Sequence, residues 1–290
     1  MNYKIFLSAV AVLCLFTKTV SAAEPVKRLS NPFFAMDTAT RDAKHQTPAQ
    51  QAEMLKELGY AGIGPDSRQC TPEMVKACDE RGLNIFAVYC GANIETKGPK
   101  YDARIPGLIK LLKGRSSLLW LYVTSKRHKP SAVEGDDRAV AIIREIADLA
   151  EPAGVRVALY PHTGFWIERV EDAVRVAKKV ERKNVGVTLN LCHFLRVGDE
   201  ANLDARLKEA APYLSIVSIN GADHKGDWNR LIQPLDRGEF NVGELLKKLS
   251  AIGYTGPIGF QGYGIGGDAH ENLKRTMDAW KKLTTPPVGN

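Results

Sequence analysis

Two histidines follow directly after largely apolar runs of the chain. His162 comes after residues 155–160, and His193 comes after residues 185–190. An imidazole titrates near neutral pH, so either side chain is able to take or give a proton in a reaction. Imidazole is also a ligand of Zn²⁺. His162 and His193 are therefore candidate catalytic residues and candidate zinc ligands. The alternative is that each ring only forms a hydrogen bond with the backbone.

Further polar side chains stand at or just after other apolar runs. Amides and hydroxyls both donate and accept hydrogen bonds, as the hydroxyl groups of a sugar require, and a tryptophan face is able to cover a sugar ring. Lys126 follows the run 118–124. Its ammonium group would stabilise a developing enolate oxygen, as would the Tyr160 hydroxyl. We therefore predict a carbohydrate site with Lys126 as a third catalytic residue and with these binding residues: Tyr160, Asn190, Ser218, Asn220, Trp228 and Gln261.

A regular alternation of short apolar strands and longer amphipathic stretches must position these side chains. Such alternation predicts a parallel sheet covered by helices. Eight units favour a single (β/α)₈ TIM barrel of the α/β class, whose site lies at the carboxyl ends of the strands. A doubly wound open sheet is the alternative, but no glycine-rich phosphate loop follows the first strand. The expected strands lie at 33–36, 61–64, 84–89, 118–124, 155–160, 185–190, 214–219 and 257–261.

Helix start and stop signals stand between these strands. Thr47 and Pro48 have the types of an N-cap and a first helical residue, and Gly59 ends the apolar stripe that follows. Thr71 and Gly82 bracket a second predicted helix in the same way.

The N-terminus has the pattern of a secretory signal peptide. Lys4 precedes an apolar run at 5–16, and small residues stand at 21–23. The run is too short to span a bilayer. We therefore expect residues 1–22 to be removed, leaving the barrel domain at 23–290, secreted or periplasmic and without stable membrane insertion. The alternative is an N-terminal membrane anchor.

N-terminal sequencing of the protein from its native host tests this expectation. Cleavage after Ala22 would give a mature chain that starts at Ala23 or Glu24, because signal peptidase requires small residues before the cut. A native chain that retains Met1 would refute the prediction.

Charge and cysteine content exclude some classes of protein. The formal net charge of +7 is spread along the chain, and the densest cluster, 126–129, contains no aromatic residue. A solvated loop explains it better than a nucleic-acid site does. Cys90 and Cys192 fit small core residues, whereas Cys70 and Cys78 are close enough in sequence to pair. Nothing in the sequence indicates an oligomeric state.

Five segments in the C-terminal half resemble the sugar isomerase/epimerase superfamily of xylose isomerase-like barrels. Their order and spacing carry the resemblance, and the N-terminal half matches only in its strand–helix rhythm. The segments are Val155–Gly164, Val185–Phe194, Leu214–Asp223, Pro234–Glu244 and Gly253–Gln261.

The resemblance implies a divalent metal held by Glu, Asp, His and Glu after strands five to eight. This chain has Tyr160, Asn190, Ser218 and Gln261 at those positions. Hard divalent cations depend on anionic oxygen ligands, so we do not expect a tightly bound Mg²⁺ or Mn²⁺. Zn²⁺ stays compatible with the residues that remain, and the weak candidate ligands are His162, Asn190, His193 and Gln261.

Two functions follow from the resemblance and from the altered positions. The first is an enzyme that moves a proton on a sugar or keto-sugar, by isomerisation, epimerisation or elimination. The second is a catalytically silent carbohydrate-binding barrel that has kept the pocket. A DNA-repair endonuclease of the same superfamily is a weaker alternative, because it needs three zinc ions and the strand ends here lack carboxylates.

Overall fold

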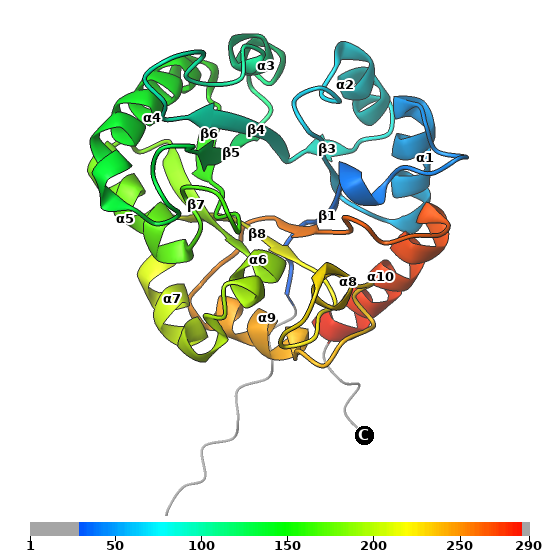
Figure 1. Ribbon diagram of the computed structural model, residues 1–290. Coiled ribbons are helices and arrows are strands. Elements are labelled where there is room, and N and C mark those ends of the chain that lie inside the picture. The colour runs from blue at the N-terminus through cyan, green and yellow to red at the C-terminus, as the bar shows by residue number, and fades with distance from the viewer. Residues whose placement is uncertain (1–28, 286–290) are drawn as a thin grey trace, which may run out of the picture.

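The computed structural model describes residues 29–285, and the expected signal peptide lies outside them. Its strands are all parallel and form a barrel, in the order β3-β2-β1-β9-β8-β7-β6-β5-β4. Figure 1 shows the ring of strands with the helices around it. The expected TIM barrel is therefore confirmed. The strands are β1 Phe33–Met36, β2 Gly62–Gly64, β3 Asn84–Ile85, β4 Ala87–Asn93, β5 Leu118–Thr124, β6 Arg156–Leu159, β7 Val185–Asn190, β8 Leu214–Ile219 and β9 Ile258–Phe260.

The nine strands fill eight barrel positions, because β3 and β4 are one stretch interrupted at Phe86. The Phe86 N–H donates to Ile63 O at 3.0 Å, and its carbonyl accepts from Leu118 N at 3.1 Å. Phe86 is thus bonded to both neighbouring strands. The interruption divides one predicted strand in two and still closes the ring.

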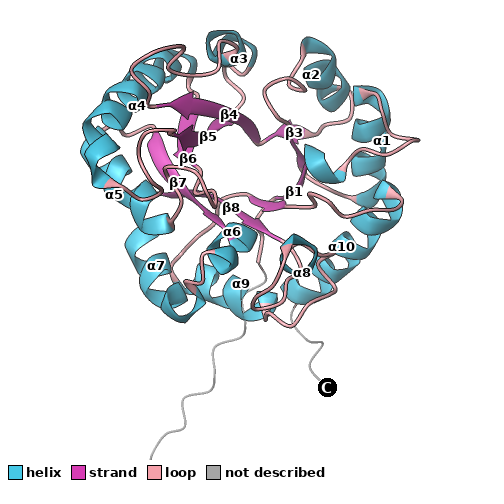
Figure 2. Ribbon diagram, in the orientation of Figure 1, coloured by secondary structure: helices cyan, strands magenta, loops and turns pink. Residues whose placement is uncertain are grey.

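The helices form the outer layer of the barrel (Figure 2). In the part of the chain that is described, none of them is long and apolar enough to cross a membrane. The helices are α1 Pro48–Leu58, α2 Pro72–Asp79, α3 Ile105–Leu111, α4 Asp136–Ala150, α5 Val170–Val180, α6 Leu191–Arg196, α7 Leu203–Ala210, α8 Trp228–Leu231, α9 Val242–Ala251 and α10 Ala269–Thr284.

The first helix begins and ends where the sequence predicts. Thr47 and Gln50 form a capping box, Pro48 is the first helical residue, and Gly59 ends the helix at φ 84°. That left-handed conformation costs glycine little, because it has no Cβ atom. Thr71 caps α2 through the Met74 N–H at 3.3 Å.

Two apolar layers hold the barrel together. Alternate strand residues such as Phe34, Trp120 and Ile216 fill its interior, and the residues between them pack against the helices. Inside the barrel the Trp120 indole N–H donates to the Thr188 hydroxyl at 2.7 Å, which connects β5 to β7. All four cysteines of the described chain are buried and unpaired, so Cys70 and Cys78 form no disulfide.

Candidate functional site

A cavity of about 780 Å³ opens among the residues that follow the strands. Its volume lies within the range of sites for small ligands. One wall is aromatic and contains both histidines, and the other wall carries charged residues from the N-terminal half of the chain. The lining residues are Met36, Asp37, Thr38, Arg41, Asp66, Ser67, Arg68, Tyr89, Asp102, Arg104, Tyr122, Tyr160, His162, His193, Trp228, Ile232, Gln261 and Tyr263.

The two histidines lie against one another within the aromatic wall. Their ring centroids are 3.9 Å apart. Phe165 also stacks on His162, at 3.9 Å, and the Trp228 indole meets His193 nearly edge-on at 5.3 Å. This packing fixes both imidazole rings before any ligand arrives.

Thr163 gives the two rings opposite hydrogen-bonding roles. Its carbonyl lies 2.9 Å from His162 Nδ1, which must therefore donate, and this leaves Nε2 of neutral His162 as a base. The Thr163 N–H donates to His193 Nδ1 at 3.3 Å, so the proton of neutral His193 lies on Nε2. One ring is thus able to accept a proton while its neighbour donates a hydrogen bond.

Burial keeps both rings neutral. It lowers the pKa of His162 below the ordinary value, and the Thr163 carbonyl opposes this shift only in part. Burial, and then the charge of a protonated His162, lower the pKa of His193 further. Two imidazolium rings in contact would repel one another, so the pair holds at most one added proton.

Tyr160 lines the cavity beside the histidines, and the buried Asn190 is bonded to it. The Asn190 amide Nδ2 donates to the Tyr160 hydroxyl. Asn190 Oδ1 accepts from the His193 N–H at 3.3 Å, because Asn190 is the N-cap of α6. Burial raises the pKa of the Tyr160 hydroxyl well above its ordinary value, so the phenol stays protonated. Asn190 therefore positions both Tyr160 and His193.

The structure brings most of the predicted residues together. Five of them line the cavity: Tyr160, His162, His193, Trp228 and Gln261. Asn190 lies directly behind this wall.

Three predicted residues lie outside the wall of the cavity. Ser218 is fully buried. Asn220 is also fully buried, and its amide donates to Leu231 O at 2.6 Å, which secures the loop after β8. Lys126 is exposed, and its backbone N–H donates to Glu95. None of the three side chains lines the cavity, and the role of Lys126 toward an enolate oxygen stays a prediction.

The residues at the expected metal positions do not fit a divalent cation. In residues 29–285 no group of three or more His, Cys, Asp or Glu is arranged to hold a metal. Gln261 Oε1 already accepts from the Thr38 hydroxyl at 3.0 Å and from the Tyr263 N–H at 3.2 Å. The Asn190 amide is used by Tyr160 and His193. The neutral donors are thus satisfied by one another, and neutral donors bind hard cations weakly.

The charged wall of the cavity contains ion pairs that the sequence did not predict. Asp66 pairs with Arg68 at 2.8 Å, and Asp102 pairs with Arg104 at 3.1 Å. Asp37 forms no ion pair among the described residues, and it is 7% exposed. Burial raises the pKa of Asp37 to about 6, and the Asp66 N–H opposes the shift. Asp37 comes directly after the first predicted strand, and the rule that site residues follow strands includes it.

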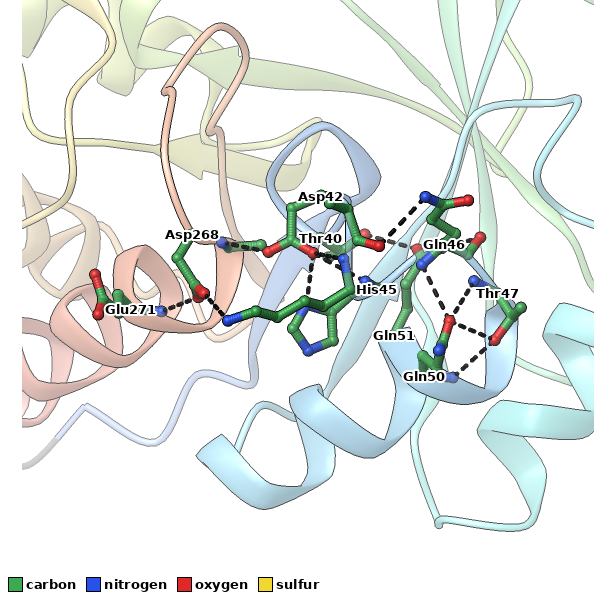
Figure 3. Close-up of polar contacts among 12 residues, drawn as sticks. Thr40, Asp42, His45, Gln46, Thr47, Gln50, Gln51, Asp268 and Glu271 are labelled. Atoms are coloured by element: carbon green, nitrogen blue, oxygen red, sulfur yellow. Dashed lines mark hydrogen bonds and ion pairs between the residues drawn. The ribbon is translucent and has the colours of Figure 1, made fainter.

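Asp42 organises the loop that follows Asp37 and β1. Asp42 Oδ1 accepts from the backbone N–H groups of Lys44 and His45, both at 2.8 Å, and contacts His45 Nδ1. Its other oxygen accepts from the Ala269 N–H at 2.8 Å, at the first residue of α10 (Figure 3). Asp42 therefore ties the loop after β1 to the last helix of the barrel.

Comparison with known proteins identifies relatives of this chain. Residues 52–283 match a family model described as xylose isomerase-like TIM barrel. A 2-oxo-tetronate isomerase of Haemophilus influenzae is 26% identical over 205 residues, which cover 64% of this chain and 76% of that protein. An inosose isomerase of Bacillus subtilis is 35% identical over 137 residues, 46% of this chain and 42% of that protein. A ketose 3-epimerase of Arthrobacter globiformis is 24% identical over 167 residues, 56% and 54% of the two chains. The chain spans about half the length of the latter two relatives.

Solved structures share the fold. A 3-keto-D-glucoside 4-epimerase of E. coli superposes with a TM-score of 0.68 at 17% identity, over 87% of this chain and 98% of that one. A D-psicose 3-epimerase of Clostridium cellulolyticum, solved with D-tagatose, gives a TM-score of 0.66 at 18% identity, over 87% and 98%. At these identities the likeness concerns the fold alone.

Proposed function

The chain belongs to the xylose isomerase-like TIM barrel family, and from this premise we propose that it binds a keto-sugar in the rim cavity and moves a proton on it without a resident divalent cation. Relatives named ketose 3-epimerase, inosose isomerase and 2-oxo-tetronate isomerase support the class of reaction. The altered metal positions support the absence of a cation from the mechanism.

The observation that carries this proposal is the pair of histidines with opposite roles. His162 offers an unprotonated Nε2, and His193 offers an Nε2–H, in one cavity. Removal of a proton from the carbon next to a carbonyl needs a base for that proton and a donor for the oxygen that becomes negative. The depressed pKa values keep both rings in these states at neutral pH.

The residues act in a simple order. The aromatic wall holds the sugar, and the His193 Nε2–H donates a hydrogen bond to its carbonyl oxygen. His162 Nε2 then takes the proton from the adjacent carbon, which leaves an enediolate and an imidazolium. Return of a proton to carbon completes an isomerisation or an epimerisation. The protonated Tyr160 hydroxyl and the Asn190 cap hold His193 in place during the transfer.

Silent carbohydrate binding is the second candidate. The observation that favours it is the mutual hydrogen bonding of Tyr160 and Asn190, since polar groups already satisfied by one another are not free to coordinate a cation. A silent barrel would keep the cavity and the aromatic wall. It would bind sugars without exchanging their protons.

Proton exchange in D₂O decides between the two functions. We expect EDTA-treated protein to replace hydrogen by deuterium next to the carbonyl of at least one D-ketohexose, because His162 serves as base without a metal. The measurement is NMR of the sugar, with the heat-denatured protein as control. Sugar binding without exchange would support the silent barrel, and exchange that disappears with EDTA and returns with Mg²⁺ or Mn²⁺ would contradict the metal-free mechanism.

A further inference from the structure

Asp37 and His162 stand on opposite sides of the same cavity. Asp37 follows β1 and His162 follows β6. From β1 to β6 the path through β9, β8 and β7 takes four steps, and the path through β2, the joined β3/β4 and β5 also takes four. The two strands are therefore diametrically opposed in the ring, as Figure 1 shows. Both residues line one cavity, so a sugar bound between them would present one face to each.

The fold positions the Asp37 carboxyl without placing it in an ion pair among the described residues. Oδ2 accepts a hydrogen bond from the Asp66 N–H at 2.9 Å. The Asp37 carbonyl accepts from the Thr40 N–H and from the Thr40 hydroxyl, both at 3.1 Å, which fixes the start of the loop. No described cation forms an ion pair with the carboxyl, in contrast to Asp66 and Asp102 in the same wall.

The surroundings of Asp37 suit a group that carries a proton. Burial is the largest influence, and it favours the neutral acid. The charge of Asp66 acts in the same direction, while Arg41 and the backbone N–H groups of Asp66 and Thr38 favour the carboxylate. Arg68 faces the same region but is paired with Asp66. The balance of these influences leaves Asp37 able to donate a proton in mildly acidic solution and to accept one at higher pH.

We infer that Asp37 is the second acid–base residue of the site and acts on the face of the sugar opposite His162, so that the protein inverts a carbon centre. This inference rests on the proposed proton transfer. His162 Nε2 takes the proton from the carbon next to the carbonyl, and the C–H electron pair becomes part of the enediolate. The Asp37 carboxyl then delivers its own proton to the opposite face of that carbon. The products are the epimer, an imidazolium and a carboxylate, which exchange protons with water to restore the starting state.

Two opposed groups and one group alone have different stereochemical outcomes. A single base on one face returns the proton to the face it came from, so the configuration at that carbon is kept. Groups on both faces allow the proton to leave from one side and arrive on the other, which inverts the centre. Asp37 is therefore the residue that would make this site an epimerase.

The variant Asp37→Asn tests the inference. Asn still accepts the Asp66 N–H through its side-chain oxygen, so the fold is expected to persist. The probes are D-fructose and D-psicose, which differ only at C3, each incubated in D₂O and followed by NMR. We expect interconversion of the two sugars to fall by about a hundredfold or more. One of the two epimers should still exchange its C3 hydrogen with retained configuration, through His162.

Asp223→Asn is the matched control. Asp223 follows β8 on the same rim and pairs with Arg230 at 2.6 Å, and it does not line the cavity. The control should interconvert the sugars at the wild-type rate. If Asp37→Asn interconverts the sugars at the wild-type rate and the wild type exchanges protons, the role of Asp37 is overturned but the proposed function is not. Absence of exchange by the wild type with every D-ketohexose would overturn the proposed function as well.

Discussion

Replacement of His162 by Asn is expected to slow ketose epimerisation by about a hundred- to ten-thousandfold, the range that general acid–base groups contribute. The Asn amide is able to replace Nδ1 as the donor to the Thr163 carbonyl, so the loop keeps its hydrogen bond. The variant lacks Nε2, and with it the base. The rate of interconversion of D-fructose and D-psicose measures the loss.

His224→Asn provides the matched control for this prediction. His224 lies on the same rim and contacts Glu200 at 2.7 Å, outside the cavity lining. It should keep the wild-type rate.

The wild-type pH profile adds a second measurement. Activity should fall on the acid side at a pH below the ordinary imidazole value, because burial lowers the pKa of His162. It should also fall on the alkaline side as Asp37, with its pKa of about 6, loses its proton. A His162→Asn rate within threefold of wild type would remove the base from the mechanism.

Replacement of Asp37 by Asn is expected to stabilise the protein at pH 8. Burial raises the pKa of this carboxyl from 3.8 to about 6 in the folded chain, whereas the unfolded chain keeps the ordinary value. The unfolded state therefore loses the proton at a lower pH than the folded state does. The free energy of unfolding decreases as the pH rises between these two pKa values. Since a tenfold change in acid dissociation is worth about 1.4 kcal/mol, the ionised carboxyl costs about 3 kcal/mol at pH 8, and Asn does not incur this cost.

Thermal denaturation at two pH values measures this effect. The advantage of Asp37→Asn should be largest at pH 8 and should disappear below about pH 4, where Asp37 is protonated in both states. Asp223→Asn should show no such gain, because Asp223 is held as a carboxylate by Arg230. A lower melting temperature for Asp37→Asn at pH 8 would mean that the carboxylate is stabilised by contacts other than those described.

Much of the fold could be predicted because parallel strands are buried on both faces and therefore stand out as apolar runs. The run 118–124 coincides with β5, and 185–190 coincides with β7. The interruption at Phe86 could not be predicted, since its residues continue the apolar pattern. The short helices α6 and α8 were also missed, because their sequences follow strand ends without a separate amphipathic stripe.

The candidate site could be predicted only where a strand end alone decides the position of a side chain. His162 and His193 are such cases, and both line the cavity. Asn220 also follows a strand, but the path of the loop after β8 turns its amide toward Leu231. The ion pairs of Asp66 with Arg68 and of Asp102 with Arg104 depend on loop conformations, which residue types alone do not determine.

The position of Trp228 makes it an intrinsic fluorescence reporter of the cavity. The other tryptophans, Trp120, Trp166 and Trp280, are buried, whereas Trp228 is 37% exposed on the cavity wall. The Arg196 guanidinium lies over its ring at 5.4 Å, and His193 meets it nearly edge-on. Indole emission depends on solvent contact and on nearby charge. A ligand that covers Trp228, or a proton that arrives on the histidine pair, therefore changes the fluorescence of this tryptophan.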